Sequence, residues 1–377
     1  MFRATSPKSN LKSVKESKIA DVLISDFKSL IKNLHECEVR TSAQNEEQIQ
    51  SYKQSLENTA DPDISLEVIN DILFDISKKN LLPDIKIINA CITKLGALKF
   101  FDEAYALYCF AVAKDLTDIK TYSIMLQILG NSKSPILFAL SVFHDAWSRR
   151  KEDALTYVFM LNAIANHHPT AHEMKLAELL FNEAVFTKKT NTLIYICMLQ
   201  LIAVSASPDV DLAEDIFSQA LLSNHAQMQT YSAMLEVISK SENPDVKLAE
   251  LIFNEAYFNK SFGSPVYTNM LSIIAKSTYP NLNFAKRVFN EAEELKLRDT
   301  IMYGSMLQVI SRSKKPDIEL AKQIFNEAKS RKQIDIITYN HMFDIAKNAE
   351  TLLDKQPKSY RNQSAMFPVV SRASIDI

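Results

Sequence analysis

The chain has 377 residues, with 43 Lys and Arg against 45 Asp and Glu, which gives a formal net charge of −2. This balance argues against generic attraction to nucleic acid or to an anionic membrane. The four glycines, Gly96, Gly130, Gly263 and Gly304, lie far apart. The clustered glycines of a Rossmann or P-loop phosphate site are therefore excluded. Since no apolar run approaches the roughly 18 residues of a transmembrane helix, we expect no membrane association.

Residues 1–60 are predicted to form an N-terminal region that is helical and partly disordered. Between residues 15 and 58, apolar residues recur at helical spacing: Ile19, Val22, Leu23, Phe27, Leu30, Ile31 and Leu34. The first residues have no apolar core and are not a secretory signal. The four cysteines contain no C-x-x-C pair, which fits a reducing compartment. We expect a cytoplasmic protein, with a mitochondrial or other organellar location, through a Ser/Lys-rich targeting segment, as the alternative.

Residues 61–350 are predicted to form an array of repeats. The string Tyr-x-x-Met-[Leu/Phe] recurs every 35 to 38 residues, at Tyr122, Tyr157, Tyr195, Tyr231, Tyr267, Tyr303 and Tyr339, with a degenerate copy at Ile88. A second string, Ala-x-x-aliphatic-Phe-x-x-Ala, recurs in step at Ala139, Ala177, Ala213, Ala249, Ala285 and Ala321, with a variant at Ala104. Each string places its apolar residues on one helical face. The two columns predict about seven pairs, each of a helix A and a helix B, plus terminal helices.

Proline separates the two helices of most pairs. It stands 13 residues after the tyrosine at Pro135, Pro208, Pro244, Pro280 and Pro316, and it ends helix A because it cannot continue a helix interior. The next residue is a candidate cap of helix B at Asp209, Asp245, Asn281 and Asp317. A pair this small cannot bury its apolar stripe alone. The predicted fold class is therefore all-α, an α-solenoid of stacked helix-turn-helix repeats of about 36 residues.

The ends of the array differ from its middle. Residues 61–83 resemble a lone helix B that caps the first repeat, with Phe74 in the phenylalanine column. A final helix A is predicted at Tyr339–Lys347. Residues 351–377 are predicted to be a polar C-terminal tail, in which Met366–Val370 is a candidate docking segment.

The strings Asp118-Ile-Lys-Thr-Tyr-Ser-Ile-Met-Leu and Asp335-Ile-Ile-Thr-Tyr-Asn-His-Met-Phe resemble the opening of a pentatricopeptide repeat. In that family a unit of about 35 residues begins near V-x-T-Y-N, ends in Asp or Asn, and carries Ala and a bulky residue in helix B. The resemblance spans the array. The chain departs from the family in its longer proline turn and in the Asn-Glu-Ala that ends helix B. Tetratricopeptide repeats are the alternative, although their Trp/Leu-Gly pattern is missing here.

The resemblance implies that each repeat selects one RNA base through two residues, the one after the helix A tyrosine and the last one of the unit. The well-formed pairs are Asn89 with Asp118, Ser123 with Asp153, and Thr268 with Asp299. Ser232 stands opposite Gly263, and Asn340 opens the last half-unit. The broken pairs are Val158 with Asn191, Ile196 with Gln227, and Gly304 with Asp335. An amide or hydroxyl beside a carboxylate can bind the Watson–Crick edge of an unpaired base. The family's preferences imply U for Asn/Asp and G for Ser/Asp or Thr/Asp.

A column of cations stands nine residues after the tyrosine, at Lys240, Lys276 and Arg312. The resemblance implies that these side chains contact RNA phosphates, which supply much of the affinity for nucleic acid. The alternative is that a cation near a helix C-terminus complements the helix dipole. Earlier copies have Asn131, Asn166 and Val204 at this position, so only the C-terminal half shows the cations.

Other columns have structural interpretations. The tyrosine and phenylalanine columns are predicted to be packed inside the array, and Trp147 is predicted to pack against the next pair. The acidic column Glu183, Glu255, Glu291 and Glu327 is predicted to be a solvated face of helix B, with a docking ridge for a basic partner as the alternative.

The sequence offers no catalytic constellation and no metal-ligand spacing. We therefore expect a protein that is not an enzyme, uses no cofactor or metal, and is a monomer. The predicted ligand is single-stranded RNA along the helix A face, with no binding to DNA. The alternative is a protein–protein interaction scaffold, in which the concave surface holds a protein or peptide as tetratricopeptide repeats do.

Overall fold

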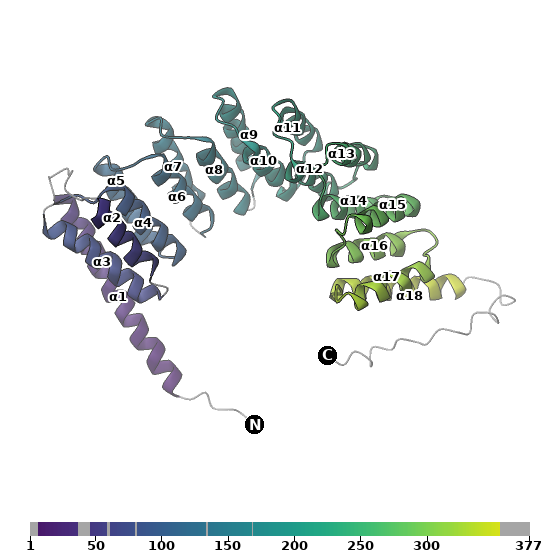
Figure 1. The fold of residues 1–377 in the computed structure, drawn as a ribbon, viewed down its shortest axis with the longest axis horizontal. Helices are drawn as coiled ribbons and strands as arrows, with labels where there is room; N and C mark the ends of the chain where they lie inside the picture. Colours follow the sequence, from purple (N-terminus) through teal and green to yellow (C-terminus); the bar gives the residue numbers. More distant parts are fainter. Residues whose placement is uncertain are drawn as a thin grey trace. The chain divides into compact units, whose positions relative to one another are not determined.

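The protein is built from α-helices joined by short links (Figure 1). The computed structural model describes residues 7–36, 46–58, 61–79, 81–132, 135–167 and 169–354. No β-strand occurs within these ranges. The helices form two compact units, the first reaching to Ala206 and the second beginning at Ser207.

The first unit contains α1 (Pro7–Glu36), α2 (Glu46–Glu57), α3 (Pro62–Lys78), α4 (Ile85–Ala97), α5 (Phe101–Ala113), α6 (Ile119–Gly130), α7 (Ile136–Ser148), α8 (Ala154–Asn166), α9 (Ala171–Phe186) and α10 (Thr192–Val204). The second contains α11 (Val210–Leu222), α12 (Met228–Lys240), α13 (Val246–Phe258), α14 (Ser264–Lys276), α15 (Leu282–Glu294), α16 (Thr300–Arg312), α17 (Ile318–Ser330) and α18 (Ile336–Asp354). The even-numbered helices from α4 onward are the A helices, and the odd-numbered ones from α5 onward are the B helices. The predicted all-α solenoid of helix pairs is confirmed.

Successive A helices pack side by side within each unit, α4 to α10 in the first and α12 to α18 in the second. Six of the column tyrosines, from Tyr122 to Tyr303, are at most 2% exposed. Each B helix from α7 to α17 places its phenylalanine edge-on against the next tyrosine, as Phe253 does with Tyr267 at a ring-centroid distance of 5.0 Å. The tyrosine and phenylalanine columns therefore form the core between neighbouring repeats, as predicted, except at the last pair, Phe325 and Tyr339, where Tyr339 is exposed.

The proline turn and its following cap are confirmed as the boundary between helix A and helix B. Asp209, Asn281 and Asp317 each accept a hydrogen bond from the backbone amide three residues later, at 3.0–3.1 Å. Asp245 accepts the amides of Lys247 and Leu248 at 2.9 and 3.1 Å. Because these amides have no partner inside the helix, the side-chain oxygens fix the residue at which each B helix begins.

Each B helix from α5 to α17 ends in the same left-handed link. The residue after the helix cap has φ between 54° and 58° at Asp115, Arg150, Lys188, Asn224, Lys260, Lys296 and Lys332. The following amide then returns to a carbonyl of the helix, as Ser261 does to Ala256 at 2.8 Å. This is the Schellman pattern, in which glycine is the usual residue. The shortage of glycine thus extends to positions where glycine would have been the least strained choice.

Neighbouring B helices are bridged by long side chains. Tyr105 of α5 reaches Ser141 of α7 at 3.2 Å, and Arg331, which follows α17, pairs with Glu293 of α15 at 2.6 Å. Trp147, the next-to-last residue of α7, donates from its indole nitrogen to Glu183 of α9 at 3.4 Å. Trp147 therefore contacts the next pair, as predicted.

The predicted N-terminal helices are present as α1 and α2. α1 packs on α3 and α5, and α2 packs on α3 and α4. Phe27 and Leu34 are fully buried, as the helical stripe predicts, whereas Val22 of the same stripe is exposed. The N-terminal side of the array is thereby covered by non-repeat helices.

The expectation that Phe74 occupies the phenylalanine column is wrong. Phe74 is 55% exposed, while its neighbour Leu73 is fully buried. The buried stripe of α3 runs through Ile69, Leu73 and Ile76, one residue earlier than the repeat register requires. α3 packs against α1, which lies outside the repeats, and this contact sets the side that it buries.

α18 is longer than the predicted segment Tyr339–Lys347. It starts at Ile336 and continues to Asp354. The candidate docking segment Met366–Val370 lies outside the described residues.

Candidate nucleic-acid interface

The last residue of each repeat lies at the N-terminus of the following A helix. The carboxylates of Asp118, Asp153, Asp299 and Asp335 accept the backbone amides of Thr121, Thr156, Met302 and Thr338 at 2.8–2.9 Å. The hydroxyls of Thr121 and Thr156 accept the backbone amides of Asp118 and Asp153 and so complete capping boxes. The acids predicted to read bases therefore also set the helix start. The Asp-x-x-Thr spacing was a sequence signal for this second role.

One predicted pair is in direct contact. Asn89 of α4 donates from Nδ2 to Oδ1 of Asp118, the cap of α6, at 3.1 Å. The oxygen of the same amide, Asn89 Oδ1, is buried and has no hydrogen-bond partner among the described residues. Burial by itself would raise the pKa of Asp118, but hydrogen bonds from Thr121 and Asn89 outweigh it and hold the pKa below its usual value. The carboxylate is therefore charged and the amide is oriented.

The remaining predicted pairs are not joined directly. Ser123 lies 3.5 Å from the Thr156 hydroxyl, which in turn bonds Asp153. Thr268 Oγ1 is buried without a partner, while Asp299 bonds Ser264 instead.

The two candidates without a carboxylate partner also differ from each other. Ser232 receives the Asn269 amide at its carbonyl and, at 3.4 Å, at its hydroxyl. Asn340 is exposed in α18. At the broken positions, Val158 and Ile196 are buried, and Gly304 has no side chain.

The predicted phosphate contacts lie in three successive A helices of the second unit. Lys240, Lys276 and Arg312 are the last residues of α12, α14 and α16, and all three are exposed. No acidic side chain in the described part of the chain forms an ion pair with any of them. Burial, followed by repulsion from Lys240 and Arg312, lowers the pKa of Lys276. The three cations therefore stand at the same end of helices that pack side by side, without an acidic ion-pair partner in the described ranges.

Side chains in this column also have a structural role that the sequence did not reveal. Asn166 donates to the carbonyl of Gly130 at 3.0 Å, and Asn348 donates to that of Ser311 at 3.2 Å. Lys276 donates to the carbonyl of Ser239 in the same way. In each case the acceptor is an unpaired carbonyl near the C-terminal end of the preceding A helix. The recurrence of Asn, Lys and Arg, all able to donate, was the available signal.

Exposed aliphatic side chains flank the caps. Leu155, Leu193, Ile301 and Ile337 each stand two residues before the column tyrosine, and all four are exposed. They lie in the first turn of their A helices, beside the carboxylate or amide that caps the helix. These residues were not singled out in the sequence, although they share one offset.

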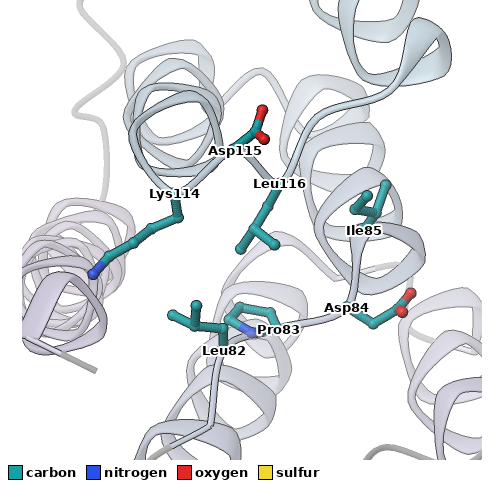
Figure 2. A pocket seen from close by; sticks show the side chains of 7 residues that line it. All are labelled: Leu82, Pro83, Asp84, Ile85, Lys114, Asp115 and Leu116. Carbon is teal, nitrogen blue, oxygen red and sulfur yellow. The ribbon is translucent and has the colours of Figure 1, made fainter. Parts of the chain in front are cut away.

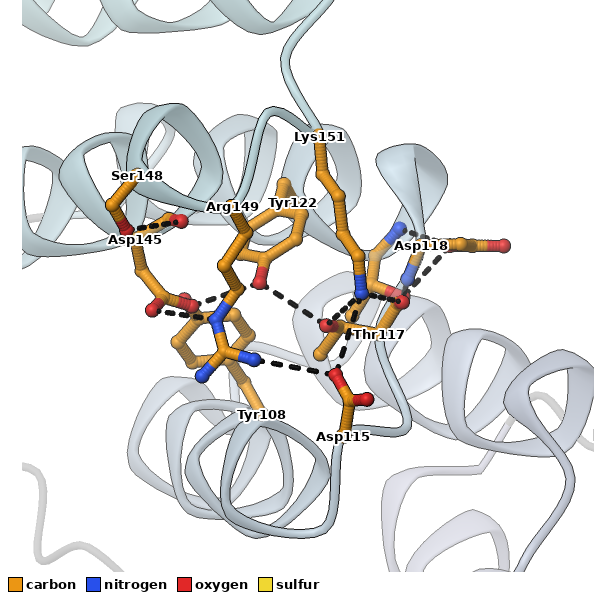
Figure 3. A network of polar contacts seen from close by, with 10 residues as sticks. Tyr108, Asp115, Thr117, Asp118, Tyr122, Asp145, Ser148, Arg149 and Lys151 are labelled. Atoms are coloured by element: carbon orange, nitrogen blue, oxygen red, sulfur yellow. Dashed lines mark hydrogen bonds and ion pairs between the residues drawn. The ribbon is translucent and has the colours of Figure 1, made fainter.

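A polar network beneath this surface ties Tyr122 to its own repeat and to the preceding one (Figure 3). Asp145 of α7 accepts the Tyr122 hydroxyl at 2.8 Å and Nε of Arg149 at 3.0 Å. Lys151 donates to the carbonyl of Thr117 at 2.8 Å, next to the cap Asp118. Burial raises the pKa of Tyr122 to about 12. The network keeps the start of α6 in a fixed position against α7.

In the acidic column, Glu327 binds a column tyrosine as Asp145 does. Glu327 accepts the Tyr303 hydroxyl at 2.8 Å and Nη1 of Arg298 at 2.8 Å. Glu183 accepts the Trp147 indole, and Glu291 pairs with Arg287 at 3.7 Å. The expectation of a simply solvated face is wrong for Glu327, which bonds the tyrosine of its own repeat.

A cavity of about 250 Å³ lies where the links before α4 and after α5 approach each other (Figure 2). Its charged residues are engaged by the protein. Lys114 donates to the carbonyl of His35 at 2.6 Å, Asp115 pairs with Arg149 at 3.3 Å, and Asp84 caps α4. The cavity therefore offers no free charged group to a ligand.

Within the described ranges, no three His, Cys, Asp or Glu side chains are grouped so that they could hold a metal ion. In the same ranges, none of the helices is both long and apolar enough to span a membrane.

The helix pairs of about 36 residues place their A helices side by side, and all A helices from α4 to α18 except α12 and α14 have Asp or Asn at the N-cap. This arrangement is a helical-repeat solenoid that resembles the pentatricopeptide-repeat class. No family model matches the sequence, and no curated protein matches it significantly. Solved structures that resemble it include the pentatricopeptide repeat protein PPR10 in complex with an 18-nt psaJ RNA element, at 17% identity and a TM-score of 0.38, covering 81% of this chain and 53% of that one. PPR10 from maize matches at 18% identity and a TM-score of 0.31, over 82% of this chain and 57% of that one. This chain spans about half the length of those chains.

Proposed function

We propose that the protein binds single-stranded RNA along its A helices, with phosphate contacts concentrated in the second unit. The observation that carries this proposal is the column of Lys240, Lys276 and Arg312, three exposed cations in successive, packed A helices that have no acidic ion-pair partner among the residues the structure describes. Like charges held within range of one another raise the energy of the free protein. A phosphate backbone would neutralise them and release counterions, which favours binding. The local charge therefore favours RNA although the whole chain carries a net charge of −2.

Base contacts in this proposal come from the N-terminal turns of the A helices. Asn89 is held by Asp118, and its amide oxygen is buried without a hydrogen-bond partner among the described residues. A base edge that displaces the cover over this oxygen would donate a hydrogen bond to it. Ser123 with Asp153 and Thr268 with Asp299 are the further candidates, with Ser232 and Asn340 lacking a carboxylate partner. Because only one pair is preassembled, we expect phosphate contacts to dominate and sequence preference to be modest.

A protein or peptide ligand is the second candidate, and the first unit favours it. At the end of the first unit, Val204 occupies the position at which later repeats carry a cation, and it is exposed. The proposed base-reading positions Val158 and Ile196 are apolar and buried. An apolar or extended peptide would suit that surface better than a phosphate chain.

The test is a fluorescence-anisotropy titration of the full chain with a randomised single-stranded RNA pool at several salt concentrations. The test variant is Lys240→Gln/Lys276→Gln/Arg312→Gln, in which glutamine at 276 can still donate to Ser239. The control variant, Lys247→Gln/Lys296→Gln/Lys329→Gln, removes the same charge from exposed positions on or beside the B helices.

We expect the test variant to lose at least about tenfold in affinity and about 2 units of salt slope, at roughly 0.7 per phosphate contact on a single strand. The control variant should bind almost as the unmodified chain does. Absence of binding at low salt, or an equal loss in both variants, would overturn the proposal.

A further inference from the structure

α18 exposes an apolar stripe that every earlier column copy buries. In the six A helices from α6 to α16, the tyrosine and the leucine four residues later are at most 2% exposed. In α18 the corresponding residues are Tyr339, at 41%, and Phe343, at 55%. The exposed stripe thus lies at positions that are core elsewhere in the array.

The phenylalanine of α17, Phe325, is also partly exposed. Phe325 meets Tyr339 edge-on at a ring-centroid distance of 5.2 Å. It is only half-buried, whereas the phenylalanines of the five preceding B helices, α7 to α15, are buried. Within the described residues, α18 has no helix B after it to cover these rings. Terminal repeats of solenoids normally carry a polar outer face, so three neighbouring aromatic rings at this end require a cover.

The chain itself carries a segment that fits. Residues 355–377 contain one short apolar run, Met366-Phe-Pro-Val-Val, in an otherwise polar stretch. Eleven residues separate it from Asp354 and can span up to about 36 Å. The distance back along α18 from Asp354 to Phe343 is only about 16 Å at 1.5 Å per residue. The run can therefore reach the stripe.

The conformation and charge of the segment are also suitable. Pro368 disfavours a helix, and in an extended run Phe367 and Val369 project on the same side. Residues 355–377 carry four basic residues, Lys355, Lys358, Arg361 and Arg372, against one acid, Asp376. α18 has the opposite balance, with Asp344, Glu350 and Asp354 against Lys347. Apolar and charge complementarity thus point to the same pairing.

We propose that Met366–Val370 folds back across α18 and covers Tyr339 and Phe343, forming a cap at the C-terminal end of the second unit. Because the segment is tethered, its effective concentration at α18 is on the order of millimolar, so even weak contacts keep it in place. This cap is independent of RNA binding.

The test is hydrogen–deuterium exchange of the full chain and its Phe367→Asp/Val369→Asp variant. The control variant, Asn362→Asp/Gln363→Asp, adds the same charge outside the apolar run. We expect the amides of α18 to exchange about tenfold faster in the test variant, because loss of a cover lowers the free energy of local opening. The amides of α12 and α14, and all amides of the control variant, should keep their rates.

A substitution in α18 tests the same contact without changing the C-terminal segment. Phe343→Asp changes a residue that is already half-exposed, so α18 should remain folded, as circular dichroism will show. We expect trypsin to cleave after Arg372 several times faster in this variant, since the segment is released.

Two results would overturn the cap. One is an equal exchange rate of α18 in the unmodified chain and in Phe367→Asp/Val369→Asp. The other is protection of α18 that rises with protein concentration and is accompanied by dimers in light scattering, which would assign the stripe to a second copy.

Discussion

At the scale of single residues, the Asp118 carboxylate serves two purposes. Oδ1 of Asp118 accepts the Thr121 amide and also the Asn89 side chain. Fixing the helix start thus fixes the oxygen that orients the Asn89 amide, which we propose reads a base. Removing the carboxylate would disturb both, so the two roles need a substitution that separates them.

The substitution Asp118→Ser separates the capping role from the orienting role, because serine keeps a capping oxygen but carries no charge. Serine is as good a helix cap as aspartate, whereas alanine costs about 1 kcal/mol. We expect Asp118→Ala to be about 1 kcal/mol less stable than Asp118→Ser in urea unfolding. Both variants should bind RNA more weakly than the unmodified chain, since neither carries the charge that holds Asn89. Equal RNA affinity in Asp118→Ser and the unmodified chain would show that the carboxylate acts only as a cap.

Gly304 leaves a gap in the base-reading column that can be filled. A Cβ added there would have no heavy atom closer than Thr338 Oγ1 at 3.8 Å, and the partner carboxylate of Asp335 is present. We expect Gly304→Asn to recreate the pair formed by Asn89 and Asp118. It should raise the affinity for a uridine-rich single strand several-fold and raise stability by a few tenths of a kcal/mol, because glycine is the poorer helix former.

Gly304→Ala is the matched control for this change. It should bring the helix-propensity gain without the amide, so its RNA affinity should stay at that of the unmodified chain. A gain in affinity equal to that of Gly304→Asn would show that the amide is not what binds.

At the scale of elements, the B helices end in strained links. Lys260 follows the cap of α13 with φ 54°, a conformation that costs an L-residue about 1–2 kcal/mol. Glycine adopts it freely but loses more entropy on folding, by about 0.5–1 kcal/mol. We expect Lys260→Gly to stabilise the protein by about 0.5 kcal/mol in thermal unfolding, the difference of these effects.

Lys260→Ala is its control and should change stability little, because alanine has the same Cβ as lysine. If glycine instead destabilised the protein, the lysine side chain would have to make a compensating contact. The same gain is expected at Lys296 and Lys332, whose φ values are 58° and 57°, and it should add across these separated links.

The ends of these helices could be predicted from the sequence where a side chain acts on its own neighbours in the chain. Pro244 and Asp245 end one helix and begin the next through their own chemistry, so the boundary could be predicted. The left-handed residue Lys260 could not, because lysine has no preference for that conformation. The register of α3 was missed for a different reason. Leu73 and Phe74 are adjacent and both apolar, and only packing against α1 decides which one is buried.

At the scale of the whole molecule, the placement of charge matters more than its sum. The net charge of −2 predicted weak binding to RNA, yet Lys240, Lys276 and Arg312 gather without acidic partners. Meanwhile acids such as Glu327 are engaged between helices by Tyr303 and Arg298. The positions of the cations in the repeat could be predicted from their spacing. Their isolation from the acids could not, because it depends on the direction in which each helix face points.

The buried tyrosines give the array a collective response to alkaline pH. Burial is the main cause that raises the pKa values of Tyr122, Tyr157 and Tyr303 to about 12, from the ordinary value of 10.0. The folded state therefore holds these protons more tightly than the unfolded state. Their contribution to stability is complete below pH 10 and is lost as the pH rises towards about 12.

We therefore expect the helices to unfold cooperatively between pH 10 and about 12, with circular dichroism and tyrosinate absorbance changing together. Tyr303→Phe removes one of these groups and should make the pH dependence less steep. At neutral pH the same substitution should cost about 1 kcal/mol, because Glu327 loses the hydroxyl that donates to it. Loss of helix before any tyrosine ionises would contradict this explanation. Because each tyrosine lies between two repeats, its ionisation would weaken the contact on which a solenoid depends, that between neighbouring pairs.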